Sequence, residues 1–181
     1  FSVAGTGGQC LMEPAIDDAK DAHQMPYAWY LAGGVLANMA VAIISIIILC
    51  LHIAGVFASC LLAMLALSGV YLAITNGIPM TIGGVANDGD NIRTLRRDAE
   101  SRRLLWIQLK ANALYTRGKR FCDMPAEWFE VPADADAGNY LWATIIGMRS
   151  SREIETLDFE AAYADLQRLR ATGTRLIEVL R

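Results

Sequence analysis

The sequence predicts an all-α membrane protein, in which a two-helix transmembrane hairpin is followed by a helical cytoplasmic domain. Three observations predict it. Of the 181 residues, 54% are hydrophobic and 19% are charged, which is an apolar balance for a soluble domain. No Asp, Glu, Lys or Arg lies between Asp21 and Asp88. Every arginine lies beyond Asp88, so an apolar block precedes a charged one.

Two segments of the apolar block are long enough to cross a bilayer. They are residues 31–53 and 56–75, and a spanning helix needs about 20 apolar residues. Residues 41–50 have no polar face, which is typical of a helix in lipid. The turn between the segments is expected near residues 52–55. The doubled length and internal position of the apolar block exclude a signal peptide.

Basic residues after the second segment predict the orientation of the hairpin. Arginine and lysine concentrate on the cytoplasmic side of membrane helices. The C-terminal domain is therefore expected in the cytoplasm, with residues 1–30 on the same side. The basic residues of this flank are Arg93, Arg96, Arg97, Arg102, Arg103 and Lys110.

The same features limit the partners and the redox chemistry of the chain. The net charge of −3 and a basic stretch next to the membrane argue against nucleic acid and favour contact with membrane lipid, including anionic headgroups. No C-x-x-C spacing suggests a metal site, so the cysteines are interpreted as reduced thiols. They are Cys10, Cys50, Cys60 and Cys122.

Glycine, asparagine and proline interrupt the apolar block at two places. Gly33 and Gly34 precede Asn38 in the first segment, and paired glycines let a neighbouring backbone approach closely. Asn76 and Pro79 follow the second segment, where proline ends a helix and asparagine can bond its unpaired carbonyls. Each pattern fits either simple helix packing and membrane exit, or the wall of a polar cavity.

A third cluster lies where the charged block begins. Residues 83–90 form a glycine-rich loop in which Asp88 is the first charged residue and is followed by Gly89. The carboxylate of Asp88 is suited to cap a helix that starts near Asn91. It is equally suited to bind a hard or borderline metal ion. The residues alone leave both interpretations open.

In their order along the chain, the three clusters resemble the second half of the site-2 protease-like intramembrane zinc metalloproteases. The resemblance consists of Gly-Gly-x-x-x-Asn, then Asn-x-x-Pro, then Asp-Gly nine residues after the proline. Residues 5–12 and 118–125 also resemble a bacterial branch of this family with a helical cytoplasmic tail. The resemblance covers nearly the whole chain, although Asn87 stands where the commoner family form has leucine.

The resemblance implies a metal site and a reaction. Asp88, followed by Gly89, is implied to be the third protein ligand of a catalytic Zn²⁺, beside two histidines. The implied reaction is hydrolysis of peptide bonds in membrane-spanning protein substrates by zinc-activated water, with a glutamate as general base. The implied location is the bacterial inner (plasma) membrane.

The remaining motif residues are implied to position the substrate and the metal ligand. Asn38 would take part in catalysis by holding substrate backbone or the developing oxyanion, next to the close approach allowed by Gly33 and Gly34. Asn76 and Pro79 would shape the chain break that returns Asp88 to the metal.

The His-Glu-x-x-His motif that the family places first is absent from this chain. His23 and His52 both lack that context. We therefore expect no catalytic zinc on this chain alone. Because the sequence starts at Phe1 in an apparent strand and turn, we expect it to be the C-terminal portion of a longer peptidase. The alternative is a non-catalytic membrane-anchored scaffold with a helical protein-binding tail.

The charged block predicts a helical tail, which places the domains at 1–90 and 91–181. A helical pattern covers 91–117, and Trp128 and Phe129 are expected to pack on a helix.

Two helices of the tail are expected to form a tetratricopeptide-like hairpin. Asn139 is suited to cap a helix over 140–149, and Asp158 to cap the next one. A further helix is expected over 174–180. One such hairpin cannot bury its own apolar face, so it packs on the rest of the tail or offers a groove to a protein partner.

Overall fold

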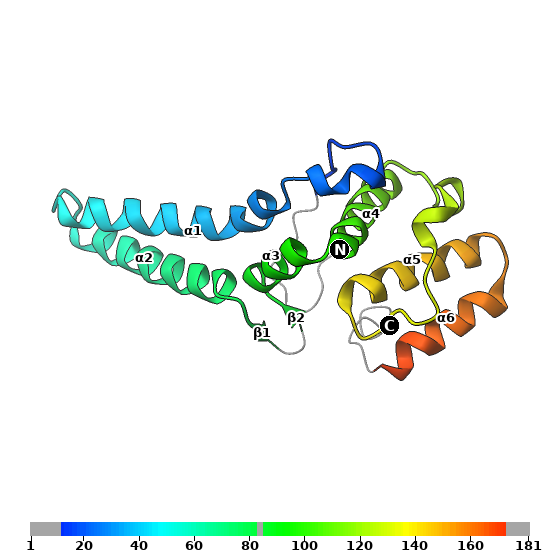
Figure 1. The fold of residues 1–181 in the computed structure, drawn as a ribbon. Helices are drawn as coiled ribbons and strands as arrows, with labels where there is room; N and C mark the ends of the chain where they lie inside the picture. Colours follow the sequence, from blue (N-terminus) through cyan, green and yellow to red (C-terminus); the bar gives the residue numbers. More distant parts are fainter. Residues whose placement is uncertain (1–11, 83–84, 173–181) are drawn as a thin grey trace. The chain divides into compact units, whose positions relative to one another are not determined.

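The computed structural model describes residues 12–82 and 85–172 of the chain (Figure 1). It is mostly helical, as predicted, and falls into two compact units. Residues 26–99 form one, called here the hairpin unit. Described residues 12–25 and 100–172 form the other, called the helical unit. The segment that precedes the apolar helices thus groups with the C-terminal part of the chain, whereas the sequence suggested a single division at residue 90.

The hairpin unit begins with two long apolar helices, α1 (Tyr27–Cys50) and α2 (Val56–Gly77). They lie side by side and antiparallel (Figure 1). The left-handed backbone of His52, with φ of 51°, ends α1 in the predicted turn region. At the other end, Ile78 is extended ahead of Pro79, which stops α2. The first helix starts and ends a few residues earlier than the predicted 31–53, because Pro26 already sets its start.

Small residues form the contact between α1 and α2. The buried positions are Ala42 and Ser45 on α1, and Ala66, Gly69 and Ala73 on α2. Such residues let two helix backbones approach closely. The large apolar side chains of both helices point outward and stay exposed, as Ile47 and Phe57 show.

Short elements connect the hairpin to the charged part of the chain. A two-stranded antiparallel ladder follows α2, and a helix then packs beside the ends of α1 and α2. The predicted single helical run over 91–117 is instead two helices, because the backbone of Asp98 is extended (φ −121°, ψ 115°). These elements are β1 (Thr81–Ile82), β2 (Val85–Ala86), α3 (Asp88–Arg97) and α4 (Ala99–Thr116).

Helix α4 carries the core of the helical unit. Trp106 and Ile107 are fully buried, and Trp106 meets the ring of Trp128 edge-on at a centroid distance of 5.2 Å. Trp128 and Phe129 belong to the short helix η3 (Ala126–Phe129), and both are buried. The packing of Trp128 on a helix is therefore confirmed.

The segment before α1 is bound to α4. The indole N–H of Trp106 donates to the carbonyl oxygen of Ile16 at 3.0 Å. Lys110 pairs with Glu13 (3.1 Å) and with Asp17 (3.0 Å). A further ion pair joins Arg117 to Glu13. The short helix η1 (Ala19–Gln24) then leads to α1.

Helices α5 (Tyr140–Glu155) and α6 (Phe159–Ala171) form the predicted helical hairpin. The Asn139 side chain accepts hydrogen bonds from the amides at the start of α5, and the Asp158 side chain accepts from Ala161 N–H. Both predicted caps are confirmed, although α5 continues beyond residue 149 to Glu155. The helix expected over 174–180 and the motif at 5–11 lie outside the described residues.

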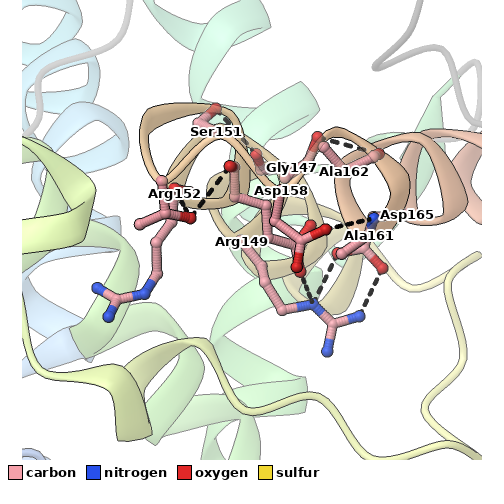
Figure 2. A network of polar contacts seen from close by, with 11 residues as sticks. Gly147, Arg149, Ser151, Arg152, Asp158, Ala161, Ala162 and Asp165 are labelled. Carbon is pink, nitrogen blue, oxygen red and sulfur yellow. Dashed lines mark hydrogen bonds and ion pairs between the residues drawn. The ribbon is translucent and has the colours of Figure 1, made fainter.

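An ion cluster joins α5 to α6. The guanidinium of Arg149 binds the carboxylate of Asp165 through two hydrogen bonds, of 2.6 and 2.5 Å (Figure 2). Glu153 lies 3.7 Å from the same guanidinium. Its Oε2 atom is buried and has no hydrogen-bond partner within the described part of the chain. Burial, and then the charge of Asp165, raise the pKa of Glu153, while Arg149 opposes this shift.

Replacing Glu153 with glutamine is expected to raise the free energy of unfolding of the helical unit by about 1 kcal/mol at pH 8. Because the pKa of Glu153 is raised, the stability linked to this group is fully present below the ordinary pKa of glutamate and is lost as the pH rises through the folded-state pKa. Denaturant unfolding at pH 4 and pH 8 measures the difference. The exposed Glu160, changed to glutamine, is the control, and equal pH dependence of Glu153→Gln and wild type would contradict the expectation.

Candidate functional site

The start of α3 lies directly against the end of α2. A Cβ atom at Gly89 would stand 2.3 Å from the carbonyl oxygen of Gly77 and 3.0 Å from the nitrogen of Pro79. The two backbones can approach this closely only because residue 89 is glycine. Gly77 in turn faces α1, since a Cβ atom there would lie 3.2 Å from Cγ1 of Val35. The candidate site is therefore built at the end of the hairpin where α1 begins and α2 ends.

Asn87 joins α2 to α3 through its side-chain amide. Its Oδ1 accepts hydrogen bonds from the N–H groups of Asp90 (3.0 Å) and Met80 (3.1 Å), so Asn87 is the N-cap of α3. Its Nδ2 donates to the carbonyl oxygens of Thr75 (2.7 Å) and Ile78 (2.6 Å). One amide thus uses its full bonding capacity to satisfy backbone groups on both sides of the chain break.

Replacing Asn87 with alanine is expected to lower the free energy of unfolding of the hairpin unit by about 3 kcal/mol. The change removes a helix cap and leaves the carbonyls of the break without their partner. Circular dichroism during unfolding in mixed detergent and SDS micelles measures the loss.

Two variants separate the parts of this effect. Asn87→Asp keeps the two accepted bonds and loses the two donated ones, so an intermediate loss is expected. Asn139→Ala removes an asparagine cap that has no second role and is expected to cost about 1 kcal/mol. A loss in Asn87→Ala no larger than that in Asn139→Ala would contradict the bridging role.

Asp88 is the first residue of α3 and is half-buried. It lies two helical turns before the buried Leu95, on the same face of the helix. Within residues 12–82 and 85–172, its carboxylate has no hydrogen bond and no ion pair. Burial raises the pKa of Asp88 above its ordinary value. A carboxylate in this setting is suited to bind a cation that approaches the hairpin end.

The cap and the helix start differ from the sequence expectation. Asn87 caps α3, rather than Asp88, and the helix begins at Asp88, rather than near Asn91. Both residue types are good N-caps, so their local sequence does not distinguish them. The bonds from Asn87 to the end of α2 decide the choice. Of the predicted loop over 83–90, positions 83 and 84 lie outside the described residues, and its last three residues belong to α3.

Asn76 and Pro79 lie on the two sides of the break, and only one acts as expected. Pro79 follows the extended Ile78 and ends α2. Asn76 lies in the last turn of α2, and its side chain makes no hydrogen bond with another described residue. The carbonyls that it was expected to bond are instead bonded by Asn87.

The close approach between α1 and α2 is not at the paired glycines. A Cβ atom at Gly33 or Gly34 would meet no described atom within 4 Å. The tight contact is at Gly69, where a Cβ atom would stand 2.8 Å from the carbonyl oxygen of Asn38 and 3.1 Å from Cβ of Ala42. Among the described residues no close packing occurs at Gly33 or Gly34, and their part in positioning substrate stays a prediction. The spacing of small residues over 66–73 was the signal for the true contact.

Asn38 is half-buried in the middle of α1, beside Gly69. Its side chain makes no hydrogen bond to any other residue that the structure describes. Asn38 is one turn further from the hairpin end than Val35, the residue that faces Gly77. Asp88 lies at that end, next to Gly89 and its contacts. Gly69, beside Asn38, comes eight residues before Gly77, which contacts Gly89, so Asn38 and Asp88 lie at different levels of the hairpin.

Asp88 is the metal ligand that the family resemblance implies at this site. No group of three His, Cys, Asp or Glu side chains that could hold a metal ion occurs in the part of the chain that the structure describes. No family model, no curated protein and no solved structure matches the chain. The case for a function therefore rests on the residues themselves and on their geometry.

Proposed function

We propose that α1 and α2 cross a membrane as a hairpin. Both helices are long enough and apolar enough to do so. Only 11% and 17% of their most apolar stretches are buried inside the protein. The core helix of a soluble protein would be mostly buried, so this exposure favours lipid as the surroundings of both helices.

The contacts of the segment before α1 support a hairpin topology. Ile16 and Glu13 bind Trp106 and Lys110, which follow α3 in the chain. Both ends of the hairpin unit are thus connected to the same folded unit, and this supports a topology in which they share one side of the membrane. The arginines of that flank favour the cytoplasmic side, and the family resemblance favours a bacterial inner membrane.

We propose further that the chain is the C-terminal portion of an intramembrane zinc metallopeptidase of the site-2 protease-like family. The observation that carries this proposal is Asp88. Its half-buried carboxylate has no partner among the described residues, and the bonds of Asn87 and the contact of Gly89 hold it at the end of an apolar hairpin. Protein groups kept in a costly environment are characteristic of functional sites.

The residues present fit one position of a zinc site and no more. Zinc in a peptidase takes three protein ligands, and no group of three His, Cys, Asp or Glu side chains that could hold a metal ion occurs among the described residues. The family resemblance assigns the other two ligands and the general base to a His-Glu-x-x-His segment. What this chain contributes is a carboxylate held in place, with the partly buried Asn38 deeper in the same hairpin as a candidate for binding substrate backbone.

The reading frame upstream of the codon for Phe1 tests this proposal. A transmembrane segment with His-Glu-x-x-His in that frame supports the peptidase. A start codon close to Phe1, with no such segment, overturns it. The substrate class would be membrane-spanning proteins, and their backbone would have to reach the hairpin end to be cleaved.

A membrane-anchored scaffold is the second candidate, and the end of the α5–α6 hairpin favours it. Leu157, Phe159 and Tyr163 are 73%, 60% and 64% exposed. Leu157 has a left-handed backbone, with φ of 65°, where glycine would be less strained. This conformation ends α5, with the N–H of Asp158 donating to the carbonyl oxygen of Glu153 at 2.8 Å, and it leaves the side chain of Leu157 exposed for a partner. In this proposal α5 and α6 act as a tetratricopeptide-like hairpin that binds a protein partner.

A further inference from the structure

We propose that Arg93 and Arg97 on α3 bind the phosphate groups of anionic phospholipids. This inference rests on the membrane insertion proposed above and is independent of the peptidase assignment. The two residues are called here the arginine pair. They are four positions apart, so they lie on the same face of the helix, one turn from each other.

Helix α3 has a packed face and an exposed face. Leu95, which lies on the opposite side of the helix from Arg93 and Arg97, is 3% exposed. Arg93 and Arg97 are both exposed. Neither forms an ion pair with a carboxylate among the described residues, and Asp90, one turn earlier, is also outside ion-pair distance. The pair is therefore available to an anion from outside the protein.

The position of α3 places the arginine pair at headgroup level. Helix α2 has 22 residues and is therefore about 33 Å long, close to the thickness of a hydrocarbon core of about 30 Å. The start of α3 touches Gly77, the last residue of α2. Trp29, in the first turn of α1 at this same end of the hairpin, is 74% exposed. Exposed tryptophan is typical of the membrane–water interface. The end of α2 and the exposed Trp29 therefore both place the start of α3 near the lipid headgroups.

The chemistry of the pair selects the ligand. A guanidinium group presents a planar fork of N–H donors that matches phosphate oxygens. An anionic phospholipid leaves its phosphate charge uncompensated, whereas a choline headgroup neutralises it. Two exposed side chains form an open site, which would bind a free phosphate ion only weakly. The membrane holds lipid phosphates next to the same side chains at high local concentration, so an open site is sufficient for them. We therefore assign the site to anionic lipid.

Native mass spectrometry of the full chain, released from micelles with equal amounts of phosphatidylglycerol and phosphatidylcholine, tests the proposal. The wild type is expected to retain phosphatidylglycerol preferentially. Arg93→Gln and Arg97→Gln are each expected to reduce this preference about fivefold, and the double variant further. Arg170→Gln, which removes an exposed arginine of α6, is the matched control and is expected to keep it.

Several other outcomes would overturn the lipid-binding proposal. Equal retention of both lipids by the wild type, or an equal loss in Arg170→Gln, would show that the pair has no lipid preference. If added inorganic phosphate were retained by the wild type as well as phosphatidylglycerol is, and were lost in Arg93→Gln and Arg97→Gln, the ligand would be a free phosphate ion and not a lipid. Release of the wild type from membranes by alkaline carbonate would overturn insertion and this inference together. If Asp88→Ala leaves cleavage intact while the lipid preference persists, only the peptidase assignment fails.

Discussion

In the longer peptidase proposed above, replacing Asp88 with alanine is expected to abolish cleavage of a membrane-spanning substrate and to lower the bound zinc. Loss of groups that only support a metal ligand costs about 10- to 100-fold, so loss of the ligand itself should cost at least about 100-fold. Elemental analysis of the purified protein and cleavage of a labelled single-span protein in vesicles measure the two effects. Asp90→Ala is the control, because only the backbone of Asp90 contributes to the break.

Stability gives this prediction a second readout. Burial raises the pKa of Asp88, so ionisation is less favourable in the folded protein than in the unfolded chain. The stability linked to this group is present below the ordinary pKa of aspartate and is lost as the pH rises through the folded-state pKa. Asp88→Asn cannot ionise and is expected to be more stable than the wild type at neutral pH, although inactive. Unchanged zinc content and cleavage in Asp88→Ala would remove Asp88 from the site.

Replacing Gly89 with alanine is expected to destabilise the hairpin unit by about 3 kcal/mol or more. The new methyl group would stand 2.3 Å from the carbonyl oxygen of Gly77. The methyl group has no rotamers and the oxygen belongs to the backbone, so no side-chain movement can relieve this clash. Either α3 moves away from α2, which disrupts the bonds of Asn87, or the end of α2 unwinds. Unfolding in mixed detergent and SDS micelles measures the loss.

The paired glycines of α1 are the matched control for Gly89. Alanine at Gly33 or Gly34 meets no atom within 4 Å among the described residues, so only helix propensity changes. That change is expected to be neutral or stabilising by up to about 1 kcal/mol. If Gly89→Ala proved as harmless as Gly33→Ala, the contact between α2 and α3 would not hold the site together.

The features that the sequence predicted correctly depend on local chemistry. The caps at Asn139 and Asp158 are set by residues within one helical turn, and the two apolar helices by an uninterrupted run of side chains. The turn near His52 follows from the two helix lengths. The caps, the two apolar helices and the turn can each be predicted from residues that are neighbours in the sequence.

The features that it did not predict depend on residues distant in the chain. Asn87 rather than Asp88 caps α3 because its side chain also donates hydrogen bonds to the carbonyl oxygens of Thr75 and Ile78. The sequence around Asn87 does not predict those distant partners. The close contact at Gly69, and its absence at Gly33, depend on which faces of two helices meet. Helix periodicity alone does not predict which face of α1 contacts α2, because small residues occur on more than one face of α1.

The binding of the first described residues to α4 sets an order for biosynthesis. Ile16 and Trp106 are separated by 90 residues, and Asp17 and Lys110 by 93, so the ribosome completes one partner on the order of 10 s after the other. Both apolar helices are translated within that interval. The helical unit can therefore close only after the hairpin has been made. In the membrane topology proposed above, a chain that inserted one helix and not the other would keep Glu13 and Lys110 on opposite sides of the bilayer, and the ion pair between them could not form.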